Sequence, residues 1–366
     1  MTQTFLSGEE KIASELRSLF SRFGYRPFKM RKFEDYDLYV RFKDYLISDH
    51  IITFTDGGKL LALKPDVTLS LIRSVGEEKG RIQKFFYQEN VYRRLRPTEP
   101  FRELLQTGLE CIGDLDDVAL GEVLFLAAES LRLISEDSVL LLSHLGILSA
   151  FLDRLTEDET VRAALYASVG DKNLPGIRAL ARENGLNEAF VEDLCRLLSL
   201  SGTPAEVLPQ LEALCAKIGA PDAVIDLTAA IFALDGTKAA SVLRLDFSAV
   251  GDGRYYNDLV FRGFVKGLPE RVLAGGQYDR LLERMGRESR GVGFAVYLDQ
   301  IALLDRDDEL DADVLLLYDE KTSPDVVRAE AARLREDGNS VLTLPSRPKN
   351  GRYGKVVTLT GGERSE

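Results

Sequence analysis

Residues Ala274–Asp279 read AGGQYD and residues Gly291–Gln300 read GVGFAVYLDQ, and these two stretches say most about the fold. The first follows a predicted strand and precedes a predicted helix. Gly275 and Gly276 suit a close approach of the backbone to a ligand, because glycine has no Cβ. The alternative is an ordinary turn at the end of the strand. The second stretch is expected to close the core of the same domain.

The composition is that of an ordinary globular protein, with 45% hydrophobic and 29% charged residues. A length of 366 residues is enough for two or three domains with a sizeable core. The chain has 47 basic and 59 acidic residues, which gives a net charge of −12. Because nucleic-acid binding depends on clustered Lys and Arg, this balance argues against tRNA as a partner.

The cysteines and histidines argue against a metal site and against a histidine-based catalytic triad. The three cysteines are scattered and show no metal-ligand spacing, which is typical of a reduced cytoplasmic protein. Only two histidines are present, His50 and His144. The first ten residues are polar and acidic rather than a secretory signal, and no apolar run approaches the ~18 residues of a membrane span.

Hydrophobic spacing and turn signals predict the elements as far as His144. Asp56-Gly57-Gly58 lies between two strand-like runs and is a strong hairpin signal. A charged loop, Arg93–Arg102, separates two long runs that we interpret as antiparallel strands. The predicted helices are 9–23, 67–75 and 116–135, and the predicted extended segments are 25–33, 51–55, 60–63, 82–90, 104–112 and 138–142.

The second half of the chain begins with a helical insertion at 144–240, where apolar residues recur every three or four positions. Strand character then returns, and an acidic linker at 305–311 precedes a final βαβ-like pattern. The predicted strands are 242–247, 255–264, 271–274, 314–318, 341–344 and 356–359, and the predicted helices are 278–285 and 323–337.

The segment Leu63–Thr68, LKPDVT, places Asp66 and Thr68 at the start of a predicted helix. A carboxylate is the natural partner of a primary ammonium group. The alternative is that Asp66 and Thr68 only cap the helix.

A second segment runs from Val91–Pro97, VYRRLRP, to Gln106–Glu110, QTGLE. Gln106 and Glu110 are four apart on a predicted strand and therefore point to the same face. A carboxamide and a carboxylate can together bind the two nitrogens of an imidazole. The alternative is a solvated, charged hairpin.

The third segment, Gly251–Asn257, reads GDGRYYN. A phenol of Tyr255 or Tyr256 can hydrogen-bond to an imidazole. The alternative is that the two tyrosines form a cross-strand packing pair.

Taken in this order, and with the two opening stretches as the fourth, these segments resemble the core of the histidyl-tRNA synthetases over about residues 5–305. The resemblance implies an α+β fold, the class II aminoacyl-tRNA synthetase-like antiparallel sheet of about six strands flanked by helices. It also implies two domains, 1–305, which includes the helical insertion 144–240, and 306–366. The second resembles a truncated form of the family's anticodon-binding α/β domain.

The resemblance also implies roles for individual residues. Asp66 and Thr68 match the groups that hold the ammonium of bound histidine, and Arg93 matches the arginine that binds the α-phosphate of ATP. The residues expected to face the histidine imidazole are Gln106, Glu110, Tyr255, Tyr256 and Tyr278.

The chain departs from the family where ATP is used. Gly251 replaces an arginine that serves histidine activation, and Arg254 stands three residues further along. Gln300 replaces an arginine that grips the ATP phosphates, and a neutral amide cannot substitute for a fixed cation. Smaller departures are Arg31 in the segment that forms the dimer interface, Leu95 where an adenine contact is common, and Gln277 where the family has arginine.

A chain that keeps a histidine pocket but loses ATP groups resembles the regulatory subunit of ATP phosphoribosyltransferase. That resemblance implies a cytoplasmic, non-catalytic protein with no cofactor, a homodimer within a hetero-oligomer. Its expected partner is the short-form catalytic subunit, which it activates, and its expected effector is L-histidine. One alternative is a divergent or truncated histidyl-tRNA synthetase that activates histidine with ATP. Another is a binding module that senses uncharged tRNA.

Overall fold

The computed structural model describes residues 8–46, 50–94, 99–220, 222–248, 255–304, 310–349, 351–361 and 363–365. The chain divides into a larger unit, Glu9–Ile301, and a smaller unit that contains Ala302–Glu366. The predicted linker at 305–311 lies largely outside the described residues. A domain boundary after residue 305 therefore stays a prediction.

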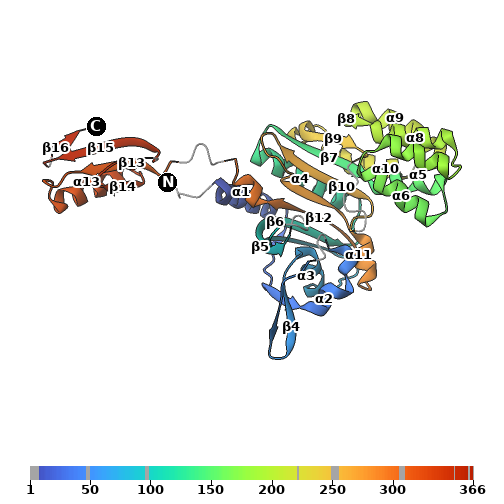
Figure 1. Ribbon diagram of the computed structural model, residues 1–366, viewed down its shortest axis with the longest axis horizontal. Helices are drawn as coiled ribbons and strands as arrows, with labels where there is room; N and C mark the ends of the chain where they lie inside the picture. Colours follow the sequence, from blue (N-terminus) through green and yellow to red (C-terminus); the bar gives the residue numbers. More distant parts are fainter. Residues whose placement is uncertain are drawn as a thin grey trace. The chain divides into compact units, whose positions relative to one another are not determined.

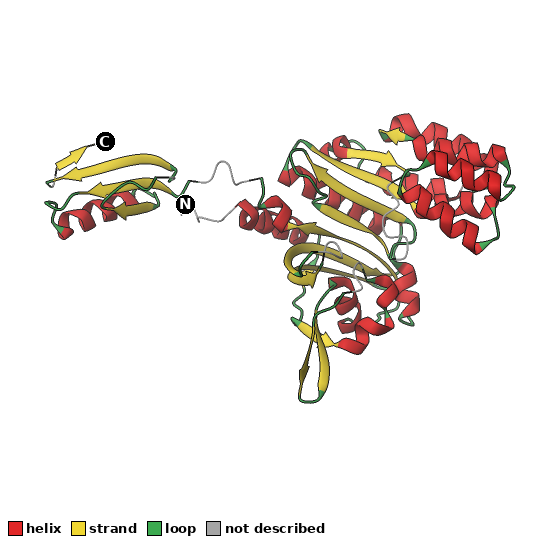
Figure 2. Ribbon diagram, viewed as in Figure 1, coloured by secondary structure: helices red, strands yellow, loops and turns green. Residues whose placement is uncertain are grey.

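The larger unit is built on a sheet with nine strands among the described residues (Figures 1 and 2). In spatial order they are β1 (Arg26–Pro27), β5 (Ile82–Arg93), β6 (Arg102–Gly113), β12 (Arg290–Tyr297), β11 (Leu273–Gln277), β10 (Leu259–Val265), β7 (Ser138–His144), β9 (Leu243–Asp246) and β8 (Ser201–Gly202). The six from β5 to β7 are all antiparallel to their neighbours. The predicted α+β class, with an antiparallel sheet flanked by helices, is confirmed.

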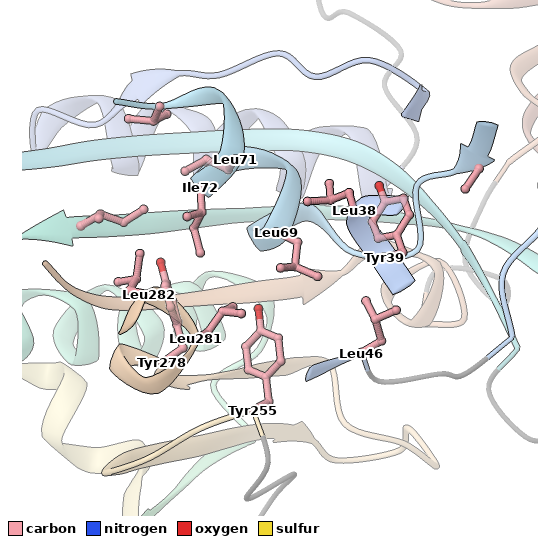
Figure 3. Packing of buried hydrophobic residues seen from close by; sticks show 13 residues of the cluster. Leu38, Tyr39, Leu46, Leu69, Leu71, Ile72, Tyr255, Tyr278, Leu281 and Leu282 are labelled. Carbon is pink, nitrogen blue, oxygen red and sulfur yellow. The ribbon is translucent and has the colours of Figure 1, made fainter. Parts of the chain in front are cut away.

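Helices cover both faces of this sheet. On one face, α1 (Gly8–Arg22) places the Phe20 ring 5.8 Å from that of Phe294 on β12. The helix α4 (Asp117–Ile134) lies on the same face, against β7, β10 and β12. The opposite face carries α3 (Val67–Ser74) and α11 (Asp279–Arg284), with the leucines of both helices in one apolar cluster (Figure 3).

Capping side chains set the starts of α3 and α4. The sequence offered the cap at Asp66 as one alternative, and the cap at Asp116 was not predicted. The carboxylate of Asp116 accepts a hydrogen bond from the Ala119 amide at 2.9 Å, and that of Asp66 accepts one from the Leu69 amide at 2.9 Å. Each satisfies one amide that a helix start leaves without an intrahelical partner. The interpretation of Asp66 as a helix cap is therefore confirmed.

The predicted helical insertion is confirmed as a bundle of short helices that follows β7 (Figure 1). Its helices are α5 (Leu145–Leu155), α6 (Glu159–Gly170), α7 (Leu174–Glu183), α8 (Glu188–Ser199), α9 (Pro204–Ile218) and α10 (Asp222–Phe232), with a 3-10 turn at Lys238–Val242. The two-residue strand β8 lies within the insertion and pairs with β9, which attaches the bundle to the edge of the main sheet.

A small second sheet projects from the larger unit (Figure 1). It contains β2 (Phe33–Asp35), β4 (Lys59–Leu63) and β3 (Thr53–Asp56), and the short helix α2 (Tyr36–Arg41) follows β2. The predicted hairpin is confirmed, with Gly57 at φ 54° and Gly58 at φ 80°. Two consecutive positive φ values are the geometry that favours glycine in a two-residue hairpin turn.

The smaller unit confirms the predicted βαβ pattern. Its described strands are, in spatial order, β14 (Val341–Leu344), β13 (Ala312–Tyr318), β15 (Tyr353–Thr360) and β16 (Glu363–Ser365). The helix α13 (Pro324–Glu336) is capped by the Ser323 hydroxyl and buries Ala331 and Leu334 against the sheet. The last strand, β16, was not predicted.

Three boundaries near the opening stretches differ from the sequence interpretation. The strand β11 continues through Gly275 and Gly276, so these glycines lie within a strand and form no turn. The helix α11 begins after Tyr278 rather than at it, and β10 begins only at Leu259, so Tyr255 precedes the strand in a loop. A short apolar run fixes the centre of a strand but not its ends.

The glycines of β11 allow close packing of neighbouring strands and rings. A Cβ at Gly275 would lie 2.4 Å from the Gly293 carbonyl oxygen and 2.4 Å from the Phe294 Cβ. A Cβ at Gly276 would lie 2.7 Å from the ring of Tyr256. The expected close approach is therefore present, and it involves the protein's own backbone and aromatic side chains.

Replacing Gly275 with alanine should destabilise the fold, because the new methyl group meets the backbone of β12. We expect Gly275→Ala to lower the free energy of unfolding by about 2 kcal/mol. The matched control is Gly76→Ala, where a Cβ meets nothing within 4 Å. That control should be neutral or slightly stabilising. Urea denaturation of both variants checks this, and equal stabilities would contradict the packing described for β11.

Candidate functional site

A narrow cavity of about 40 Å³ lies on the α3 and α11 face of the main sheet. All seven residues predicted to contact histidine line it, together with Arg93. Its full set of lining residues is Asp66, Val67, Thr68, Tyr87, Arg93, Gln106, Glu110, Tyr255, Tyr256, Ala274, Tyr278, Gly293, Phe294, Ala295 and Tyr297. The structure thus brings together residues that are up to 231 positions apart in the chain, from Asp66 to Tyr297.

Glu110 lies at the centre of this inner cavity and joins three elements. Its Oε1 accepts a hydrogen bond from the Thr68 hydroxyl of α3 at 2.6 Å, and its Oε2 accepts one from the Tyr278 hydroxyl at 2.7 Å. Opposite Glu110 on β12 stands Gly293, where a Cβ would lie only 2.0 Å from the Glu110 Oε2. The glycine therefore makes the space that the carboxyl group occupies.

Burial changes the charge state of Glu110. The side chain is 2% exposed, and burial raises the pKa of its carboxyl to about 8. The hydrogen bonds from Thr68 and Tyr278 lower that pKa and the nearby Asp66 raises it, but burial is the largest effect. The carboxyl group is therefore mostly protonated at neutral pH in this state of the protein.

Asp66 is the second buried carboxyl group of the inner cavity. Burial raises its pKa, while the Leu69 amide and the charge of Arg93 lower it. Its Oδ1 caps α3, and the residue also lines the cavity, so the capping role and a ligand-binding role are compatible. Two buried carboxyl groups make the cavity a favourable place for a cationic ligand.

The three tyrosines form one side of the inner cavity. The ring of Tyr255 lies 4.8 Å from that of Tyr256, edge to face. It lies 6.2 Å from that of Tyr278, also edge to face (Figure 3). Burial raises the pKa of all three phenols, so each stays neutral and able to donate. Because Tyr255 and Tyr256 precede β10 in a loop, the interpretation as a cross-strand pair is wrong.

Gln106 lies on β6 on the same side as Glu110, as the spacing predicted. It is 4% exposed, and its Nε2 has no hydrogen-bond partner among the described residues. A buried amide donor without a partner is costly and is rare in folded proteins. The inner cavity therefore has a donor that a ligand or a water molecule would satisfy.

A wider cavity of about 350 Å³ adjoins the inner one, and Arg93 and Tyr297 line both. The residues that line this outer cavity are Arg93, Leu104, Arg262, Phe264, Glu270, Arg271, Tyr297, Asp299 and Gln300. Arg93 is 4% exposed, and its Nε has no hydrogen-bond partner among the described residues. Arg93 therefore lines both the inner cavity, which has the carboxyl groups of Asp66 and Glu110, and the outer cavity, which also has Arg262 and Arg271.

Gln300 lies in the outer cavity, in the short helix α12 (Leu298–Ile301). Its Nε2 donates to the Asp299 carboxylate at 3.3 Å, so the amide is engaged with an acidic neighbour. Two cations here were missed from the sequence, Arg262 and Arg271. Arg262 could have been found from the sequence, because it is the one charged residue in LVFRGFV, the otherwise uncharged sequence of β10.

Some residues singled out from the sequence take no part in this geometry. Gly251, Arg254 and Leu95 lie outside the described residues. The guanidinium of Arg94 lies 4.7 Å from the centre of the Phe101 ring, and Arg94 lines neither cavity. In the part of the chain that the structure describes, no group of acidic, His or Cys side chains is arranged to hold a metal ion, and no helix is long and apolar enough to cross a membrane.

Comparison with known proteins shows which family the chain belongs to. The family model for histidyl-tRNA synthetase matches residues 5–301. The chain belongs to the histidyl-tRNA synthetase family. Within it, the chain is 24% identical to the ATP phosphoribosyltransferase regulatory subunit of Oceanobacillus iheyensis, over 92% of this chain and 84% of the relative. It is 27% identical to the histidine–tRNA ligase of Methanocaldococcus jannaschii, over 93% of this chain and 84% of the relative.

Solved structures of the histidyl-tRNA synthetase family share the fold. An ATP phosphoribosyltransferase regulatory subunit/histidyl-tRNA synthetase from Bacillus halodurans superimposes with a TM-score of 0.76 at 24% identity, covering 96% of this chain and 94% of its own. An ATP phosphoribosyl transferase (HisG:HisZ) complex from Thermotoga maritima gives a TM-score of 0.63 at 18% identity, covering 81% and 98%. At these identities the likeness shows the class II synthetase-like fold.

The raised pKa of Glu110 predicts how stability depends on pH. The folded protein holds this proton up to about pH 8, whereas an ordinary glutamate loses it near pH 4.5. Protonated Glu110 contributes its full stabilisation to the folded protein below about pH 4.5. This contribution decreases as the pH rises and is lost as the pH passes the folded pKa of about 8. Between about pH 5 and pH 8, the protein should lose roughly 3 kcal/mol more stability than Glu110→Gln, which cannot ionise.

Urea denaturation at several pH values measures this difference. The control is Glu288→Gln, whose carboxylate is exposed and paired with Lys79 at the surface. The stability of Glu288→Gln should change with pH in the same way as that of the unsubstituted protein. Parallel stability curves for the protein and Glu110→Gln would show that Glu110 ionises normally when folded.

Proposed function

We propose that this chain is the regulatory subunit of an ATP phosphoribosyltransferase and that it has no catalytic activity of its own. In this role it activates a short-form catalytic subunit and transmits feedback by histidine in the first step of histidine biosynthesis. The names of several relatives support this role, as does the fold it shares with a HisG:HisZ complex. By the same resemblance we expect a cytoplasmic homodimer within a hetero-oligomer.

One observation carries the proposal. The seven residues predicted to contact histidine all line the inner cavity, whereas the outer cavity is lined by Gln300 at the position of a phosphate-binding arginine of the family. The ammonium of histidine would lie against Asp66 and Thr68, and its imidazole against Glu110, Gln106 and a tyrosine hydroxyl. Gln300 offers no positive charge to a phosphoryl group, and its amide is already bound to Asp299. This combination favours binding of histidine without its activation.

The size of the inner cavity supplies a mechanism for regulation. The inner cavity is narrow, at about 40 Å³, and we expect its walls to move apart when histidine binds. Histidine would then bind a wider state better than the narrow one seen here. A difference in affinity between two states is what shifts an equilibrium, typically by 1–3 kcal/mol in allosteric proteins.

Histidine binding should depend on Glu110. We expect the purified chain to bind L-histidine in isothermal titration calorimetry and Glu110→Ala to weaken that binding at least tenfold, about 1.4 kcal/mol, because the imidazole loses its acceptor. Glu288→Ala, which removes an exposed carboxylate that lines neither cavity, is the control. No heat at millimolar histidine, or unchanged affinity in Glu110→Ala, would remove the assignment of the pocket.

A second candidate function is a divergent histidine–tRNA ligase. It is favoured by the relative from Methanocaldococcus jannaschii and by the arginines of the outer cavity, Arg93, Arg262 and Arg271. These side chains line the outer cavity together with the acidic Glu270 and Asp299, and we assign Arg93 as a residual phosphate-binding residue. The two functions differ in whether ATP reacts with histidine.

Two assays separate the candidates. The regulatory role predicts that the chain raises the activity of the short phosphoribosyltransferase of the same organism by at least tenfold and that histidine reverses this effect. It also predicts no histidine-dependent exchange of pyrophosphate into ATP above the background of Arg93→Ala. Exchange that disappears in Arg93→Ala would instead establish the ligase function.

A further inference from the structure

The helix α10 in the helical insertion has apolar side chains on two sides. Its inner side buries Val224, Leu227 and Ala230. On its outer side, Ile225 is 64% exposed and Phe232 is 74% exposed. Asp222 and Asp226 of α10 are exposed as well, so the helix is apolar on two faces rather than all round.

The exposed side chains of α10 form a continuous stripe. Ile225, Thr228, Ala229 and Phe232 follow the i, i+3, i+4, i+7 spacing of one helical face. They line a groove of about 480 Å³. The other lining residues are Val224 of α10 and Glu212 of α9. Scattered exposed apolar residues need no explanation, but a contiguous apolar groove marks an interaction site.

The stripe belongs to an ordered part of the fold. The helix α10 packs closely on α4, where a Cβ at Gly121 would lie 2.6 Å from the Cβ of Ala233, the residue after Phe232. The following Leu234 is 1% exposed. Phe232 therefore lies between two buried residues, Ala230 and Leu234, each 1% exposed.

The charges around the groove are acidic. Glu212 lines it, and Asp222 lies one turn before Ile225 on the same side of α10; both are exposed. Within the described part of Pro204–Phe232, Lys217 is the one basic residue, and its Nζ lies 2.9 Å from the Asp193 carboxylate of α8. A partner that covers the stripe must therefore place apolar side chains in the groove and basic ones at its rim.

This charge pattern disfavours a second copy of the chain as the partner. A two-fold symmetric contact puts the same patch on both sides of the interface. Glu212 and Asp222 of one copy would then meet the same carboxylates of the other, and like charges brought together across an interface cost binding energy. A different protein with a basic rim has no such conflict.

We propose that the α10 stripe is the docking surface for the catalytic subunit, through an apolar ridge flanked by Lys and Arg. This proposal rests on the function proposed above, and it assigns the partner contact to the insertion rather than to the histidine cavity. Large aromatic side chains at the centre of an interface commonly dominate its affinity. Phe232 is expected to have that role here.

The test uses the full chain and the short phosphoribosyltransferase subunit of the same organism. The double variant Ile225→Ser/Phe232→Ser should weaken binding in biolayer interferometry at least tenfold, with the affinity for histidine unchanged. Val326→Ser, at an exposed position of α13 in the smaller unit, is the control and should bind normally. Because the substituted residues are exposed, the melting temperature of each variant should match that of the unsubstituted chain.

A charge variant tests the acidic rim separately. Glu212→Lys should weaken the partner's binding and make it less sensitive to salt, because one attractive pair is lost. Unchanged partner affinity in both the double variant and Glu212→Lys would overturn the docking surface and leave the proposed function intact. If the unsubstituted chain neither binds nor activates the partner, the proposed function fails and the docking surface fails with it.

Sedimentation velocity tests whether a second copy of the chain, rather than the catalytic subunit, covers the α10 stripe. If the double variant dissociates a homodimer of the chain and keeps its partner affinity, then a second copy covers the stripe and the proposal is wrong. If the oligomeric state of the isolated chain is unchanged while partner affinity falls, the assignment to the catalytic subunit holds.

Discussion

The site depends on one buried carboxyl group, that of Glu110. Glu110 extends from β6 into the space left by Gly293, and Thr68 and Tyr278 donate to its two oxygens from α3 and from the residue before α11. Three elements distant in sequence therefore meet at one side chain. An ionised carboxylate in this position would be poorly solvated, which is why the group keeps a proton well above the usual pH.

This arrangement makes the cavity sensitive to what occupies it. A ligand cation placed against Asp66 and Glu110 would compensate buried negative charge that is otherwise suppressed by protonation. The rings of Tyr255, Tyr256 and Tyr278 line this cavity and pack against one another, so a ligand there would contact them. In the proposed role, binding of such a ligand would be linked to the packing of α3, α11 and the loop before β10, which is what a regulatory subunit requires.

The sequence predicted the elements of the fold better than their ends. The cap at Asp66 was predictable because capping is a local interaction between a side chain and the next turn. The convergence of Gln106 and Glu110 was predictable from the two-residue period of a strand. The boundary of β10 was not, because Tyr255 and Tyr256 have high strand propensity but are held in a loop by contacts with other segments.

The outer cavity shows what a motif-based interpretation misses. Comparing motif positions with a family pattern finds losses such as Gln300, but it does not cover charges that lie outside the compared segments. Arg262 and Arg271 lie on or next to strands β10 and β11, and only the pairing of those strands shows that they face the same cavity as Arg93. The absence of one family arginine therefore does not determine the charge of the cavity. Fold and family limit the possible chemistry, and the geometry of individual cations and carboxyl groups decides between a ligase and a regulator.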